Sequence, residues 1–331
     1  MLSAQRLPGI FFALAAGLMW GLVFIGPLLL PEYPATLQSF GRYLAFGLIA
    51  LPLAWFDRHK LWQLSKADWL EALKLALVGN VVYYLLLASA IQRAGGPLPT
   101  MIIGTLPVVI TITSKLRRAA PGARAEAPLP WLRMLPSLAL IGLGIGLVNH
   151  VELAHLKSDP HADLARYALG GLLAAGAVAC WTWYPIRNAE WLRAHPGRSP
   201  RGWATAQGLA TLPLALLGYG ATWSWNALTD QPFAMPFGPR ATDFLLLMFA
   251  IGLFASWLGT LCWNEASQRL PPTLSGQLIV FETLAALGYA FTLRGRWPPA
   301  ETLAGVGFLV AGVVWAVRTQ PSSAATGAHP N

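Results

Sequence analysis

The stretch SGQLIVFETLAALGYAF, residues 275–291, decides how this chain folds. As a helix it is long enough to cross much of the roughly 30 Å hydrocarbon core of a bilayer, yet it carries one carboxylate, Glu282, near its middle. A charged side chain at that depth costs about 2.5–3.5 kcal/mol on insertion scales, so such residues face the protein interior and mark functional sites. The stretch therefore predicts a membrane protein with a polar interior.

The composition of the whole chain agrees with this prediction. Of its 331 residues 55% are hydrophobic and 11% are charged, whereas soluble domains carry about 25% charged residues. The net charge of +9 comes from Lys and Arg clusters between apolar runs, which favours anchoring in a lipid bilayer over binding of nucleic acid. Cys180 and Cys262 lie inside apolar runs and predict no disulfide framework. We expect a multi-pass protein of the bacterial inner membrane.

Ten apolar runs are long enough for membrane helices, and none alternates with the period of two that a barrel requires. They cover residues 9–30, 35–56, 70–91, 97–116, 131–150, 166–187, 202–222, 242–264, 272–293 and 300–318. The segments on the side of the N-terminus hold 15 Lys and Arg against six on the other side, which predicts that both termini are cytoplasmic. The predicted fold class is an all-α membrane protein with ten transmembrane helices.

Two sequence similarities suggest that the chain is duplicated. LAAG at 14–17 recurs at 173–176, and SAIQRAGGP at 89–97 resembles EASQRLPPT at 265–273. Because five is odd, a duplicated half of five helices must insert upside down relative to the first. The sequence therefore predicts two inverted five-helix repeats.

The repeat divides the chain into four segments. Residues 1–150 form the first repeat and residues 166–318 form the second, inverted one. Residues 151–165, with three acidic side chains, are predicted to be an external linker. Residues 319–331 are small and polar and predict a disordered cytoplasmic tail.

Several stretches carry a family resemblance: AAGLMWG at 15–21, GRYLAFGLIALPL at 41–53 and GTLPVVITI at 104–112. Over nearly its whole length the chain resembles the drug/metabolite transporter superfamily, and LCWNEA at 261–266 is similar to its aromatic amino-acid exporter branch. The resemblance implies export of amino acids by alternating access. Related proteins commonly carry proline where this chain has Glu282, so a coupling mechanism does not carry over.

Candidate cavity residues are the polar and aromatic side chains inside the apolar runs. Asn80 and Tyr84 share one helix face and either contact a substrate or join neighbouring helices. Trp181 and Tyr184 form either a cavity wall or part of an interfacial aromatic belt. The full set is Trp20, Asn80, Tyr83, Tyr84, Trp181, Tyr184, Trp263, Asn264, Gln277 and Glu282. Of these, Gln277 faces either the cavity or a packing seam.

Two of the ionisable residues within the apolar runs, Arg42 and Glu282, admit several roles. Arg42 binds a substrate carboxylate, pairs with Glu282, or packs near the interface with hydrogen bonds to helix carbonyls. The last role is the favoured one. Glu282 carries a proton, binds the amino group of a substrate, or has a structural role with a neighbouring donor. These alternatives stay open at the level of sequence.

Proline residues mark places where helices are expected to flex, namely Pro107, Pro271 and Pro272. The sequence has no HExxH, Walker A or GxSxG motif, and its six histidines lack the spacing of metal ligands. We therefore expect neither an enzyme nor a metal or other cofactor.

The sequence favours a secondary transporter that exports small metabolites, most notably amino acids including aromatic ones. The alternative is a proton-coupled exporter of cationic or hydrophobic drugs that uses Glu282. A sugar-phosphate exchanger is expected to need several Lys or Arg residues at mid-membrane, and only Arg42 qualifies. The oligomeric state is left open.

Overall fold

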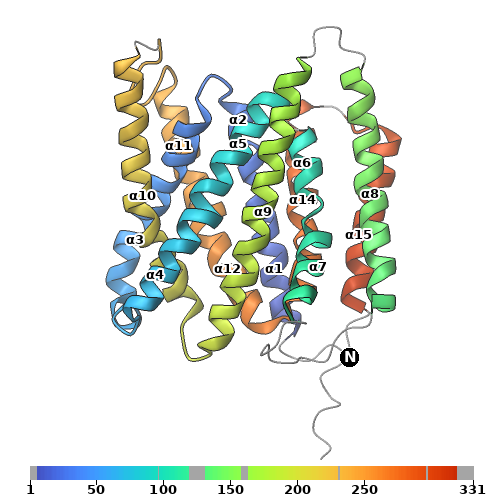
Figure 1. Cartoon of the computed structure of the whole chain (residues 1–331), viewed down its shortest axis with the longest axis horizontal. Coiled ribbons are helices and arrows are strands. Elements are labelled where there is room, and N and C mark those ends of the chain that lie inside the picture. Colours follow the sequence, from blue (N-terminus) through green and yellow to red (C-terminus); the bar gives the residue numbers. More distant parts are fainter. Residues whose placement is uncertain are drawn as a thin grey trace, which may run out of the picture.

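The computed structural model describes residues 6–95, 97–118, 131–157, 163–229, 232–295 and 297–318. All regular structure in these ranges is helical. The helices stand side by side with their axes roughly parallel, and each long helix runs in the opposite sense to the one before it (Figure 1). The predicted tail over 319–331 lies outside the described residues.

The first five predicted runs are helical, and three of them are interrupted. The elements are α1 (Arg6–Trp20), η1 (Gly21–Phe24) and α2 (Gly26–Leu29); α3 (Ala35–Leu61); α4 (Lys66–Leu75), η2 (Ala76–Val82) and α5 (Tyr83–Ala94); α6 (Pro97–Ile103) and α7 (Leu106–Arg118); and α8 (Trp131–Lys157). The segment η1 is a 3₁₀-helix and η2 is a π-helix.

The second five runs follow a similar plan. They form α9 (Leu164–Ala194); α10 (Pro200–Leu228); α11 (Ala241–Ile251), η3 (Gly252–Leu258) and α12 (Gly259–Arg269); α13 (Pro272–Leu278) and α14 (Val280–Arg294); and α15 (Ala300–Arg318). The segment η3 is again a π-helix.

Local signals in the sequence set several helix ends. The Ser65 hydroxyl accepts a hydrogen bond from the Asp68 backbone N–H, and the Asp68 carboxylate accepts one from the Ser65 N–H, which makes a capping box at the start of α4. Ser199 caps α10 by accepting from the N–H of Gly202. Gly295 ends α14 with a φ of +60°, a left-handed conformation that glycine adopts without strain.

Helices α8 and α9 extend beyond the predicted apolar runs, and the external position of the 151–165 linker stays a prediction. Helix α8 continues to Lys157 and α9 begins at Leu164, so both ends of the predicted 151–165 linker are helical. Within the described ranges, six helical segments have the length and hydropathy to cross a membrane, the longest being Leu164–Ala194, and two shorter apolar helices accompany them. The count of ten spans and the cytoplasmic termini stay predictions.

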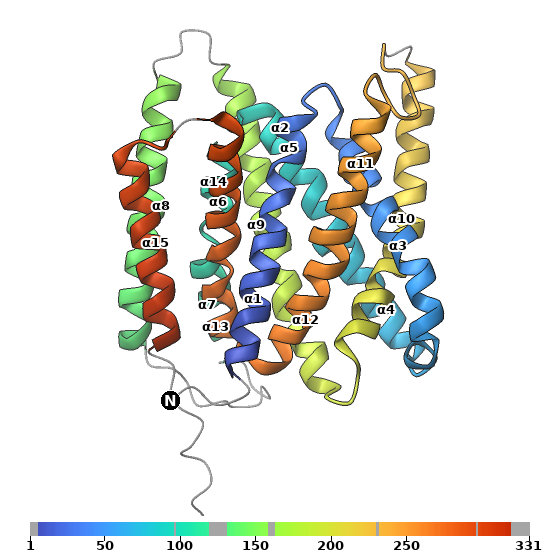
Figure 2. The ribbon, with the colours of Figure 1, turned by 180° about the vertical axis from the view of Figure 1, so that it is seen from behind.

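Helices from the two halves pack against each other in related pairs. Helix α3 packs along α10, and α8 packs along α15 at one side of the bundle (Figure 2). Helix α5 packs on α9, as α12 packs on α1. A twofold relation between the halves would exchange α3 with α10 and α8 with α15. It would also convert the contact of α5 with α9 into that of α12 with α1. The arrangement is the one that the predicted inverted repeat calls for, and the repeat itself remains a prediction.

Candidate functional site

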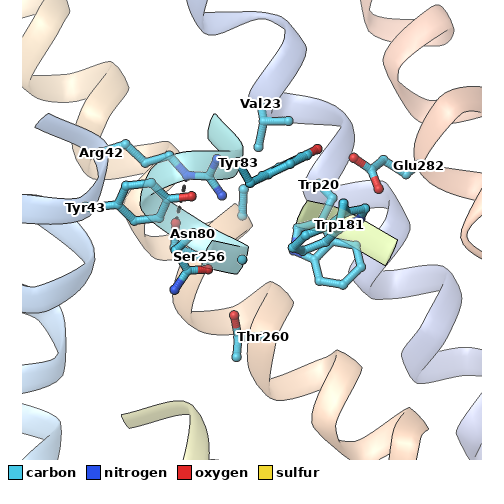
Figure 3. Close-up of a pocket in the computed structure, with 12 residues that line it drawn as sticks. Trp20, Val23, Arg42, Tyr43, Asn80, Tyr83, Trp181, Ser256, Thr260 and Glu282 are labelled. Atoms are coloured by element: carbon cyan, nitrogen blue, oxygen red, sulfur yellow. Dashed lines mark hydrogen bonds between the residues drawn. The ribbon is translucent and has the colours of Figure 1, made fainter. Parts of the chain in front are cut away.

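A small closed cavity lies at the centre of the bundle, where α1, α3, α9 and the two π-helices meet (Figure 3). Its volume is about 10 Å³, close to what a single water molecule requires. Its lining residues are Trp20, Val23, Arg42, Tyr43, Gly79, Asn80, Tyr83, Trp181, Ala255, Ser256, Thr260 and Glu282.

The two π-helices bring polar groups to the cavity wall. Asn80 lies in η2 and Ser256 lies in η3, and each is preceded in sequence by a small lining residue, Gly79 or Ala255. A Cβ atom on Gly79 would lie 2.1 Å from the ring of Tyr184, so glycine allows η2 to approach α9 this closely. Single-turn π segments inside α-helices are frequent at functional sites.

Arg42 reaches the cavity from α3 and is almost completely buried, with 4% of its surface exposed. Its Nε donates a hydrogen bond to Ser256 Oγ at 2.9 Å. The guanidinium carbon lies 4.5 Å from the ring centre of Tyr84 and 4.9 Å from that of Tyr43, within cation–π range. The Nη1 atom is buried without a hydrogen-bond partner among the described residues.

Glu282 approaches from the opposite side and is 1% exposed. It lies in the first turn of α14, directly after the break at Ile279, where the positive end of the helix dipole favours a carboxylate. Gly17 and Gly21 bring α14 close: a Cβ on Gly17 would lie 3.0 Å from the Glu282 nitrogen, and one on Gly21 would lie 2.7 Å from the Ala285 Cβ. Two glycines four residues apart thus determine where the carboxylate is placed.

Aromatic rings lie between the two charged residues and in the layer behind them. Tyr83 stacks on Trp181 with ring centres 4.6 Å apart, and Trp181 stacks on Tyr184 at 4.9 Å. Trp20 meets the edge of Trp181 at 4.9 Å and tilts against Trp263 at 5.2 Å. The ring of Tyr83 extends across the cavity with its hydroxyl towards Glu282 (Figure 3).

Four buried polar atoms at the cavity lack a hydrogen-bond partner among the described residues: Arg42 Nη1, Tyr83 OH, Trp181 Nε1 and Glu282 Oε2. The Tyr83 hydroxyl and the Trp181 indole lie beside the Glu282 carboxylate, and Arg42 acts on it electrostatically. A buried polar group without a partner costs about 1–3 kcal/mol. Donors and an acceptor in this state are suited to a polar ligand.

The structure brings six of the predicted site residues together at the cavity: Trp20, Arg42, Asn80, Tyr83, Trp181 and Glu282. Three others form a second layer behind them. Tyr84 lies under the Arg42 guanidinium, Tyr184 behind Trp181, and Trp263 behind Trp20. Trp181 and Tyr184 are both buried and therefore lie in the interior rather than at the lipid interface.

The remaining predicted residues lie away from the cavity lining. Gln277 donates a hydrogen bond to Ser137 Oγ at 3.3 Å, which places it at a packing seam with α8. Pro107 follows the break between α6 and α7, and Pro271 and Pro272 lie at the junction of α12 and α13. Within the part of the chain that the structure describes, no cluster of metal-binding side chains occurs.

Sequence reasoning missed Tyr43, Ser256 and Thr260, which also line the cavity. Tyr43 directly follows Arg42 in the quoted 41–53 stretch, so that stretch contained a signal for it. Ser256 and Thr260 look like ordinary small residues of an apolar run, and nothing in the sequence marks the helix face that they share as the one that meets the cavity.

A hydrogen-bonded network joins α9, α10 and α12 on the side where α1 begins, the side predicted to be cytoplasmic. Asn188 of α9 donates to Asn264 Oδ1 of α12 at 2.8 Å. The Asn188 Oδ1 accepts from Trp203 Nε1 at 2.9 Å and from Gln207 Nε2 at 3.2 Å, both on α10. The predicted cavity residue Asn264 therefore belongs to this network, whose centre is Asn188.

Comparison with known proteins agrees with this architecture. Residues 7–121 match the profile of the EamA-like transporter family. The chain is 53% identical over 318 residues to "Inner membrane protein YtfF" of Escherichia coli (strain K12), covering 96% of this chain and 97% of that protein. A crystal structure with 18% identity shares the fold at a TM-score of 0.66, over 96% of this chain and 99% of the other. The chain therefore belongs to the EamA-like transporter family and is a multi-pass protein of the inner membrane.

Proposed function

We propose that this transporter exports small zwitterionic metabolites, amino acids including aromatic ones, and binds them between Arg42 and Glu282. The observation that carries the proposal is a buried cavity with Arg42 and Glu282 on opposite sides, each with a polar atom that makes no close hydrogen bond to the described residues. Arg42 Nη1 would donate to the carboxylate of the substrate, and Glu282 Oε2 would accept from its ammonium group. Both hydrogen bonds are charge-assisted and therefore strong.

The aromatic residues between the charges determine the class of side chain. Trp20, Tyr83 and Trp181 offer ring faces and edges, which bind apolar and aromatic groups and contribute about 0.5–1.5 kcal/mol per favourable ring pair beyond buried area. Arg42 is the single Lys or Arg among the lining residues. A doubly charged phosphate would have one cationic partner and a carboxylate nearby, which argues against phosphorylated substrates.

Transport requires the helices to move, because the cavity of about 10 Å³ does not hold an amino acid. We propose alternating access, in which the two halves act as inverted repeats and open the cavity to one side at a time. The interrupted helices support this mechanism. The α-helix is already interrupted at η1, at Gly104–Thr105 and at Ile279. The backbone can therefore bend at these places without breaking further helical hydrogen bonds.

The proposal is tested by uptake of labelled tryptophan into liposomes that carry the purified protein, with empty liposomes as the control. Unlabelled phenylalanine and threonine should compete. Tryptamine, which lacks the carboxylate, and indole-3-propionate, which lacks the amine, should compete poorly, because each leaves one buried charge unpaired. Equal competition by either analogue would contradict recognition of both charges.

A second candidate is the proton-coupled export of cationic or hydrophobic drugs. The observation in its favour is the buried Glu282 carboxylate beside the Trp181 and Tyr83 rings, because aromatic faces also bind cations. Dye flux that follows an imposed pH gradient, with no tryptophan uptake, would favour this candidate. In that case Glu282→Gln should abolish the dependence on the gradient.

A further inference from the structure

An apolar groove of about 930 Å³ runs along the outside of the bundle, between α3 and α11 with η3 at its base. It lies apart from the central cavity, and the two share no lining residue. Leu48 on one wall and Leu246 and Phe249 on the other are 57%, 65% and 54% exposed. The groove therefore opens sideways, towards the bilayer that surrounds an inner-membrane protein.

The length of the groove matches one leaflet. Its α3 wall extends from Gly41 to Leu53, and twelve residues of helix rise roughly 18 Å. The hydrocarbon core is roughly 30 Å thick, so the groove covers somewhat more than half of it.

The lining chemistry excludes a polar ligand. Tyr219 and Trp257 are the lining residues with a polar side-chain atom. The Tyr219 hydroxyl donates to the Pro236 carbonyl at 2.5 Å, and Trp257 Nε1 donates to Thr205 Oγ1 at 3.4 Å. Both polar atoms are therefore used within the protein, and the groove offers only hydrocarbon contact to an occupant.

We propose that this groove is a binding site for one acyl chain of a membrane phospholipid. The groove surface is continuous with the lipid-facing surface of the bundle, where acyl chains are the surrounding solvent. A helix from a second copy of the chain is the alternative occupant, and the test below distinguishes the two.

The site lies directly behind the cavity wall. Leu253 and Trp257 of η3 face the groove, whereas Ala255 and Ser256 of the same segment face the cavity. Ser256 accepts the hydrogen bond from Arg42 Nε. An acyl chain in the groove thus packs against the back of the helical segment that positions Arg42.

The test uses the full chain in liposomes that contain a phosphatidylethanolamine with a photoreactive diazirine on its acyl chain. After illumination, mass spectrometry of peptides should find adducts concentrated on 41–53 and 244–257. Leu48→Trp, which fills the groove, should lower their yield by about tenfold, the equivalent of losing roughly two buried methylene groups. Leu217→Trp, at a leucine of α10 that is 72% exposed and outside the groove, should leave the yield unchanged.

Adducts spread evenly over the lipid-facing helices of the wild-type protein would overturn the proposal without any variant. So would an unchanged yield in Leu48→Trp. A wild-type dimer that becomes a monomer in Leu48→Trp, judged by size-exclusion chromatography with light scattering, would assign the groove to a second copy of the chain instead. Each readout is independent of what the central cavity transports.

Discussion

Replacing Asn188 by alanine should open the bundle on the side where α1 begins. Asn188 is fully buried and forms three side-chain hydrogen bonds, to Asn264, Trp203 and Gln207. These bonds join α9 to α10 and α12, and they all depend on one amide. Alanine removes the amide and leaves three buried partners unsatisfied, so the closed arrangement loses stability relative to an opened one in which water reaches them.

The magnitude follows from the number of orphaned groups. Each costs about 1–3 kcal/mol when left buried, and the lower figure gives a minimum estimate. Three groups then total about 3 kcal/mol, and a tenfold change in an equilibrium corresponds to about 1.4 kcal/mol. The population of the opened state should rise by roughly a hundredfold.

The assay measures access to the cavity. Thr260, a cavity residue that is 4% exposed, becomes a single reporter as Thr260→Cys in a protein that carries Cys180→Ser and Cys262→Ser. Inside-out vesicles are treated with a membrane-impermeant maleimide, and Asn188→Ala should accelerate labelling from this side. The matched control is Asn226→Ala, which removes one long hydrogen bond of 3.4 Å at the other end of the bundle.

An unchanged labelling rate together with a lower melting temperature would refute the reasoning, because it would make the network a general support of the fold rather than a barrier. Faster labelling from right-side-out vesicles instead would refute the predicted orientation.

Three further predictions concern the site itself. Glu282→Gln should lower tryptophan uptake by at least about tenfold, since a charge-assisted hydrogen bond contributes about 1.5–3 kcal/mol. The control Glu265→Gln lies outside the cavity lining and should leave uptake unchanged. Equal losses of uptake in the two variants would show that Glu282 does not belong to the site. Arg42→Lys retains the charge but loses the planar group that donates to Ser256 and lies over Tyr84. The KM for tryptophan should therefore rise more than kcat falls, and an unchanged KM would contradict this prediction. Gly79→Ala should lower the melting temperature in detergent by an amount equivalent to about 1–3 kcal/mol, because its Cβ overlaps a tyrosine ring, whereas Gly220→Ala, with open space around it, should have no such effect.

The sequence alone determined that the chain is helical and crosses a membrane. Long apolar runs have one solution in hydrocarbon, because every backbone N–H and C=O must be satisfied within the segment, and a helix does this locally. The same reasoning predicted that Glu282 faces inwards, since its charge is too costly to expose to lipid. The structure places it at 1% exposure beside the cavity.

Only the tertiary structure decided which polar residues meet. Asn264 looks as suitable for a cavity as Asn80, yet it bonds to Asn188 in the network between α9, α10 and α12, while Gln277 bonds to Ser137. Ser256 becomes a partner of Arg42, which is 214 residues away in the chain. These outcomes depend on which helices pack against each other and on glycines that let helices approach. Both effects come from packing between distant segments, which hydropathy along a single segment does not report.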